Sequence, residues 1–181
     1  MNDTQTSAST RSTLLRALAM NFAATFACAA HADCGPVIAA YAKAEATGRY
    51  ALFDVNSIAE VPNGQPFHVT IGGAGYINMG ETYKKGGSTA GFEGSNLKSR
   101  EKRGEARCEP LGERKIGAEQ AIGYQILRND NGKPAPDPNA IDMWVNRSTG
   151  LPLFHGIGWM KGGLRWVYGA EVSAPPPGKI K

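Results

Sequence analysis

The side chains with the most chemical reactivity in this sequence are three cysteines and three histidines. His68 and His155 stand far apart in the chain, and neither belongs to a zinc-protease or nucleophile motif. The glycine-rich run at 72–75 is followed by no Lys-Ser/Thr pair, so it predicts a β-turn and no phosphate-binding loop. We therefore expect a protein without enzymatic activity, metal or cofactor, in which His155 is a packing or surface residue of a strand.

The N-terminal 32 residues predict export. Arg11 and Arg16 supply positive charge, an Ala-rich apolar stretch runs up to Ala30, and small residues at Ala30 and Ala32 form a signal-peptidase site before Asp33. We expect cleavage between Ala32 and Asp33 and a periplasmic location.

Two alternatives to this processing stay open. The first is a lipoprotein that is cleaved before Cys28 and anchored through it, although Thr25 and Phe26 stand where such sites usually carry Leu and a small residue. The second is a disordered N-terminus, with the true start of the protein at Met20.

Removal of the signal leaves Cys34 and Cys108 as an even pair in an oxidising compartment, which predicts a disulfide. The bond would close a loop of about 74 residues, for which the chain-entropy argument gives about 4 kcal/mol at most. That is a large share of a typical folding stability of about 5–15 kcal/mol. A catalytic or metal role is disfavoured because there is no C-x-x-C spacing and the two histidines after the signal, His68 and His155, are far apart in sequence.

Residues 33–175 are long enough for a single β-rich domain with its own core. The full chain has a formal charge of +4, and removal of the signal leaves about +3, which is low for a nucleic-acid-binding protein. No later segment has 18 consecutive apolar residues, so we expect no transmembrane segment after processing. Residues 176–181, at the end of a proline run, are expected to form a loose tail.

The elements that would position these residues are one helix and a series of strands. Helical spacing of Val37, Ile38 and Tyr41 predicts a helix over 36–46, which Pro36 opens and Gly48 ends. Alternating patterns then predict strands near 50–58, 67–71, 76–79, 108–115, 120–128, 141–146, 151–157 and 164–172. We expect a mostly β, α+β fold in which one N-terminal helix packs on a curved antiparallel sheet, a half-barrel.

The segment from Lys84 to Arg107 has few apolar residues and predicts a solvated loop between strands. The alternative is an electrostatic contact with an acidic partner or an anionic lipid surface, worth about 1 kcal/mol per well-placed basic residue. Phe92 is its only aromatic residue, which argues against nucleic acid. The candidate contact residues are Lys98, Arg100, Lys102 and Arg103.

Aromatic and large apolar side chains gather in the last third of the sequence. On consecutive antiparallel strands such side chains can share one face. They form either an ordinary core beneath the helix or a concave face that accepts an apolar ligand. The candidate ligand-face residues are Tyr124, Trp144, Leu153, Trp166 and Tyr168.

The segment 143–153 reads Met-Trp-Val-Asn-Arg-Ser-Thr-Gly-Leu-Pro-Leu, a hairpin, and Arg165–Tyr168 follows as a closing strand. Together with the upstream segment Gly117–Tyr124, in which a glycine leads into a strand, this order resembles the periplasmic lipoprotein-carrier group, the LolA/LolB-like half-barrel. The resemblance implies an incomplete barrel wrapped around helices, with a hydrophobic cavity for acyl chains. The carriers use several helices as a lid and this sequence shows one clear helix, so no functional residue is carried over.

These observations favour an exported, periplasmic, non-enzymatic protein that binds a lipid or other apolar ligand on a curved sheet or assists envelope assembly. The alternative is a structural or protein-interaction module without a ligand cavity, which contacts an acidic partner through the basic Lys84–Arg107 segment. The expected partner is thus an apolar ligand or an envelope protein.

Overall fold

The computed structural model describes residues 33–128, 140–157 and 162–181. The expected signal segment lies outside these residues, as do Cys28 and Ala32, whereas Asp33 is described and exposed. The contacts of the chain divide it into the units Met1–Ala30 and His31–Lys181. The described residues all belong to the second unit.

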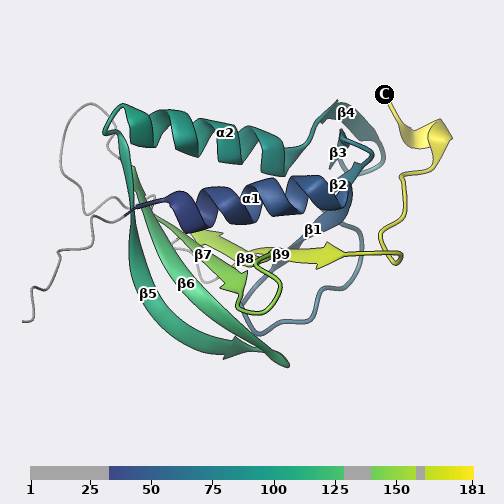
Figure 1. Cartoon of the computed structure of the whole chain (residues 1–181). Coiled ribbons are helices and arrows are strands. Elements are labelled where there is room, and N and C mark those ends of the chain that lie inside the picture. Colours follow the sequence, from purple (N-terminus) through teal and green to yellow (C-terminus); the bar gives the residue numbers. More distant parts are fainter. Residues whose placement is uncertain (1–32, 129–139, 158–161) are drawn as a thin grey trace, which may run out of the picture. The chain divides into compact units, whose positions relative to one another are not determined.

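Two α-helices, nine strands and one short 3-10 helix make up the described part of this unit (Figure 1). In chain order they are α1 (Gly35–Thr47), β1 (Arg49–Val55), β2 (His68–Ile71), β3 (Ala74–Asn78), β4 (Tyr83–Gly87), α2 (Thr89–Lys102), β5 (Ala106–Ile116), β6 (Glu119–Arg128), β7 (Ile141–Asn146), β8 (Pro152–Ile157), β9 (Gly163–Tyr168) and η1 (Pro177–Lys179).

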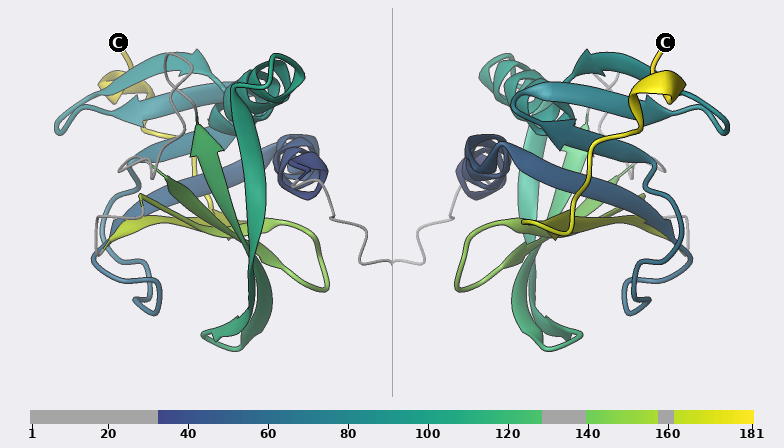
Figure 2. Two further views of the ribbon diagram at one scale, coloured as in Figure 1. Left: turned by 90° about the vertical axis from the view of Figure 1, so that its left-hand side faces the viewer. Right: turned by 90° about the vertical axis from the view of Figure 1, so that its right-hand side faces the viewer.

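The nine strands form one antiparallel sheet in the order β4-β3-β2-β1-β9-β8-β7-β6-β5. Strands β1 to β4 are one meander and β5 to β9 are a second, and α2 carries the chain between the two outer edges. In the middle, β1 pairs with β9, with Tyr50 opposite Tyr168 and Val55 opposite Gly163. The expected fold class is confirmed, because an N-terminal helix packs on an open, curved, antiparallel sheet (Figure 2).

The predicted helix is present as α1, on the hollow side of the sheet. Pro36 lies in its first turn, where the absence of an N–H costs nothing, and Gly48 ends it in the left-handed conformation, with φ of 64°. Val37, Tyr41 and Ala44 are buried on the side that faces the sheet and α2. Helical spacing of apolar residues therefore sufficed to locate this element.

The second helix corrects the expectation of a loop over 84–107, since that segment contains most of β4, all of α2 and the start of β5. The Ser88 hydroxyl caps α2 by accepting the Gly91 N–H at 3.2 Å. The buried face of α2 consists of Ala90, Gly94 and Leu97. A β-carbon at Gly94 would lie 3.0 Å from Cβ of Tyr41 on α1, so small residues let the helices approach. This face has too few large apolar residues to show a helical pattern in the sequence.

The sheet separates a main core from two smaller clusters. The main core lies between the sheet and the helices and contains Tyr41, Tyr50 and Trp166. On the other side, Trp144 packs with Leu153, Phe154 and Ile116 in a second cluster. Ala51, Val69 and Val172 form a third. Both sides of the sheet are therefore partly covered, the second side by hairpins and loops.

The predicted cysteine pair is close enough for a disulfide, with the two Sγ atoms 2.04 Å apart. Cys34 directly precedes α1, and Cys108 lies on the edge strand β5. Both are buried, and the backbone N–H of Cys34 also donates to Glu101 at the end of α2, at 2.6 Å. The start of α1 is thereby tied to one edge of the sheet.

The segment 176–181, expected to be a loose tail, is attached to the opposite edge of the sheet. It contains η1, after which Ile180 forms a parallel bridge with Tyr83 of β4. The Lys181 N–H donates to the Tyr83 carbonyl at 2.8 Å. These bonds satisfy part of an edge strand that would otherwise be open to pairing with other chains.

Candidate functional site

The five residues of the predicted ligand face lie on two sides of the sheet. Tyr124, Trp166 and Tyr168 belong to the helix-side core, whereas Trp144 and Leu153 pack in the cluster on the other side. Strand alternation explains the division on β7, where Met143 points into the main core and the next residue, Trp144, therefore points away. The five side chains do not form one continuous surface.

On the helix side, aromatic rings pack closely against one another. The ring centroid of Trp166 lies 5.1 Å from that of Tyr50, 6.1 Å from Tyr41 and 6.2 Å from Tyr168. These distances are typical of contacting aromatic pairs. The rings therefore act as the core between α1 and the sheet.

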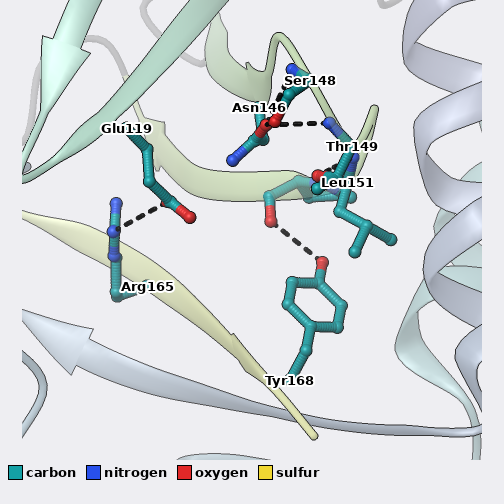
Figure 3. Close-up of polar contacts among 8 residues, drawn as sticks. Glu119, Asn146, Ser148, Thr149, Leu151, Arg165 and Tyr168 are labelled. Carbon is teal, nitrogen blue, oxygen red and sulfur yellow. Dashed lines mark hydrogen bonds and ion pairs between the residues drawn. The ribbon is translucent and has the colours of Figure 1, made fainter.

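Space for a ligand lies where β8 and β9 separate. The last residue pair of the two strands is Phe154 with Arg165, so Trp166, Val167 and Tyr168 extend past the paired region. The Tyr168 hydroxyl spans the opening and donates to the Pro152 carbonyl at 2.9 Å, and burial raises the tyrosine pKa, which keeps this donor protonated. In Figure 3, Glu119 and Arg165 lie on one side of the opening, and Thr149 and Leu151 on the other.

This opening is the mouth of a hollow of about 540 Å³. Its apolar walls come from the strands β5, β8 and β9, from the turn between β7 and β8, and from the loop between β1 and β2. They are Pro62, Ile116, Leu151, Leu153, Trp166, Val167 and Tyr168. Three of the predicted ligand-face residues, Leu153, Trp166 and Tyr168, thus meet at one hollow, while Tyr124 and Trp144 do not line it.

A second hollow, of about 560 Å³, adjoins the first on the side of the sheet away from the helices. Its floor consists of Ala51, Phe53 and Val69, and the loop that contains Val61 forms a wall. The two hollows share Pro62, Val167 and Glu171. We call the two adjoining hollows the groove.

Asn146 fixes the hairpin wall of the groove. Its Oδ1 accepts the Ser148 N–H at 2.9 Å, the Ser148 hydroxyl at 2.8 Å and the Thr149 N–H at 2.9 Å (Figure 3). Such side-chain-to-backbone bonds are typical of Asn in tight turns. Thr149 and Leu151 are therefore held in place beside the opening.

Three charged side chains line the groove, namely Glu119, Arg165 and Glu171. The guanidinium of Arg165 is 3.7 Å from the Glu119 carboxylate, and its side chain is only 15% exposed. Burial lowers the pKa of Arg165, while Glu119 opposes that shift. Glu171 is exposed, and it forms no ion pair with another residue in the described ranges.

The predicted basic contact residues lie on and just after α2 and do not form a loop. The Arg103 guanidinium is bound to the Glu105 carboxylate by two hydrogen bonds of 2.7 Å. Arg100 donates to the Asn96 side chain at 3.3 Å, and Lys98 lines a smaller hollow of about 330 Å³ between the two helices. Lys102 ends α2. This end of α2 therefore presents fewer uncommitted cations than its sequence suggests.

Neither described histidine lies within hydrogen-bonding distance of a described carboxylate. His68 is buried, with Nε2 2.9 Å from the Thr70 hydroxyl and its ring stacked on Tyr50. His155 is half-buried on β8. Among residues 33–128, 140–157 and 162–181, no three His, Cys, Asp or Glu side chains are grouped to hold a metal ion.

The two histidines predict a specific dependence of stability on pH. Burial lowers the pKa of His68 to about 4, and burial with Arg128 lowers that of His155 to about 4. The unfolded chain therefore binds protons first as the pH falls below about 6.5, which favours unfolding until about pH 4. We expect His68 alone to cost about 2 kcal/mol between pH 7.5 and pH 5.

Urea unfolding of the wild type and of His68→Gln at both pH values checks this expectation. From pH 7.5 to pH 5, the free energy of unfolding should fall by about 2 kcal/mol less in the variant than in the wild type, because the variant lacks His68. An equal fall in both proteins would contradict a neutral, buried His68.

No family model matches the sequence, and a search of curated proteins finds no significant match. No helix in the described part of the chain combines the length and the apolar character that a membrane span requires. The assignment of function therefore depends on the groove itself.

Several groove residues had no signal in the sequence. Val61 and Pro62 lie in a loop between strands, and Glu171 follows the last strand, where the pattern predicted continued β structure. β9 ends earlier, at Tyr168, because Gly169 adopts a φ of 102° and the Val172 N–H donates to the Gly169 carbonyl at 3.2 Å. Only the turn-forming Pro62-Asn63-Gly64 sequence indicated that the chain reverses here.

Proposed function

We propose that this chain is an exported, periplasmic, non-enzymatic protein that holds a lipid or other apolar molecule in the groove. The observation that carries the proposal is the pair of adjoining hollows with mainly apolar walls, each within the range of about 300–1,000 Å³ usual for small-molecule sites. The buried cysteine pair at disulfide distance also fits an oxidising compartment.

The groove differs in position from the cavity that the resemblance to lipoprotein carriers implies. In those half-barrels the ligand space would lie against the helices, but here Tyr41, Tyr50 and Trp166 occupy that side. The proposal therefore places the ligand largely on the side of the sheet away from α1 and α2. The curved sheet then has a packed side and a binding side.

Native mass spectrometry of protein purified from periplasm, followed by organic extraction, tests the proposal. We expect a fraction of the protein to carry additional mass that extraction removes and that is recovered as an apolar molecule. Protein that is always free of such mass, and that also binds no neutral apolar probe, would overturn the proposal.

A charge placed in the groove should weaken binding. Val61 is 79% exposed and lines the second hollow, so Val61→Asp would put a carboxylate beside the apolar ligand at little cost to folding. We expect the affinity for the neutral fluorescent probe N-phenyl-1-naphthylamine to fall about fivefold, because a hydrated carboxylate replaces apolar contact area of the site. Fluorescence titration measures the effect.

Met79→Asp is the matched control. Met79 is a 64% exposed apolar residue that lines neither hollow of the groove, so it should leave the probe affinity unchanged. Equal loss in both variants would indicate non-specific surface binding and contradict the groove as the site.

The alternative, an interaction module that contacts an acidic partner through Lys98, Arg100, Lys102 and Arg103, makes a different prediction. Charge reversal at Lys98 and Lys102 would abolish partner binding and leave the probe titration unchanged. Since Arg103 is already paired with Glu105, we favour the groove.

A further inference from the structure

The charges that line the groove indicate what kind of apolar molecule it would accept. We propose that the ligand carries a positive charge, as an amine, guanidine or quaternary ammonium group on an apolar chain, and that this group lies beside Glu171. The inference rests on the proposed function and adds the sign of the ligand's charge.

Glu171 is the charged residue that both hollows share. The turn from Gly169 to Val172, closed by the 3.2 Å bond between the Val172 N–H and the Gly169 carbonyl, holds it at their junction. A ligand that extends through both hollows passes this carboxylate. Within the described residues no lysine or arginine forms an ion pair with Glu171, so its charge is not neutralised by the protein.

The one cation in the lining does not offset this charge. Glu119 and Glu171 carry two negative charges against the single positive charge of Arg165, so the described lining has a formal charge of −1. Arg165 is 3.7 Å from Glu119, and its buried Nη1 has no hydrogen-bond partner among the described residues. Arg147, on the hairpin beside the groove, is itself bound to the Glu113 carboxylate at 2.5 Å. An anionic head group at the junction would meet the unpaired carboxylate of Glu171.

Competition against bound N-phenyl-1-naphthylamine tests the sign of the charge. The competitors are dodecyltrimethylammonium and dodecanoate, which have the same chain length and opposite charges, both used below their micelle concentrations. We expect the cation to bind about fivefold or more tightly than the anion. Glu171→Gln should weaken the cation about three- to fivefold, the effect of one partly exposed charge pair, and leave the neutral probe unchanged.

Two further variants make the test specific. Glu171→Lys should reverse the preference between the two amphiphiles, because it replaces the junction charge by its opposite. Glu81→Gln removes an exposed carboxylate that lines neither hollow of the groove and should change nothing.

The outcomes separate this inference from the proposed function. Two results would overturn the inference of a positively charged ligand while the apolar binding function stands. In the first, the neutral probe binds but the anion competes as well as the cation. In the second, the neutral probe binds but Glu171→Gln leaves the affinity for the cation unchanged. If the probe and both amphiphiles fail to bind, the proposed function is overturned as well.

Discussion

Replacement of both Cys34 and Cys108 by alanine should lower the free energy of unfolding by about 4 kcal/mol, the largest effect we expect from any change outside the aromatic core. The bond closes a loop with a sequence separation of 74 residues, so its loss gives the unfolded chain much more freedom. The loss also frees the start of α1 from the edge strand β5. At the lower end of the typical stability of about 5–15 kcal/mol, such a variant would keep only about 1 kcal/mol.

Urea unfolding of the full chain with Cys28→Ser, with and without the two alanine substitutions, measures this effect. Dithiothreitol should destabilise the parent and leave the double variant unchanged, which provides the control. Thiol titration of the denatured, unreduced parent should detect no free thiol. Two free thiols per chain would refute the disulfide.

Trp166→Ala should destabilise the protein by about 3–5 kcal/mol, because it empties the centre of the helix-side core. The indole is 3% exposed and contacts the rings of Tyr41, Tyr50 and Tyr168, which come from α1, β1 and β9. These neighbours belong to different elements and cannot all move into the space. Equilibrium urea unfolding followed by circular dichroism measures the loss.

Trp166→Phe is the informative comparison and should cost only about 1 kcal/mol. The indole Nε1 is buried and has no hydrogen-bond partner among the described residues. Phenylalanine fills less of the core, but the substitution also removes this polar group, which is costly to bury. A phenylalanine variant as unstable as the alanine variant would show that the N–H has a partner. An alanine variant as stable as the wild type would contradict the central packing role.

Local sequence patterns were enough to predict the elements whose ends are set by particular residues. Pro36 and Gly48 bound α1, and the turn at Arg147–Gly150 separates β7 from β8, as predicted. The cysteine pair followed from the count of cysteines that remain if the chain is exported and its signal removed. The helix α2 was missed because its buried face is built of Ala90, Gly94 and Leu97, and such a face is recognisable only beside Tyr41 of α1.

The groove was less predictable than the fold. Aromatic residues in the last strands did indicate Trp166, Tyr168 and Leu153, which line it, but the pattern could not tell which side of the sheet each residue faces. The bulge between Trp144 and Val145 changes the register with β8. The groove also depends on the point where β8 and β9 separate and on loop residues such as Val61, which no periodic pattern marks.

The strand order has a consequence for how the chain folds. Each meander can form from near neighbours in sequence, but the central pair β1–β9 joins residues from the two ends of the domain, as Leu52 with Trp166. Contacts of such long range are slow to form, so closure of the sheet is expected to be the rate-limiting event of folding. A bond between Cys34 and Cys108 shortens the chain path between these strands by about a third, which reduces the entropy cost of that closure. An oxidising compartment would therefore speed folding as well as stabilise the product.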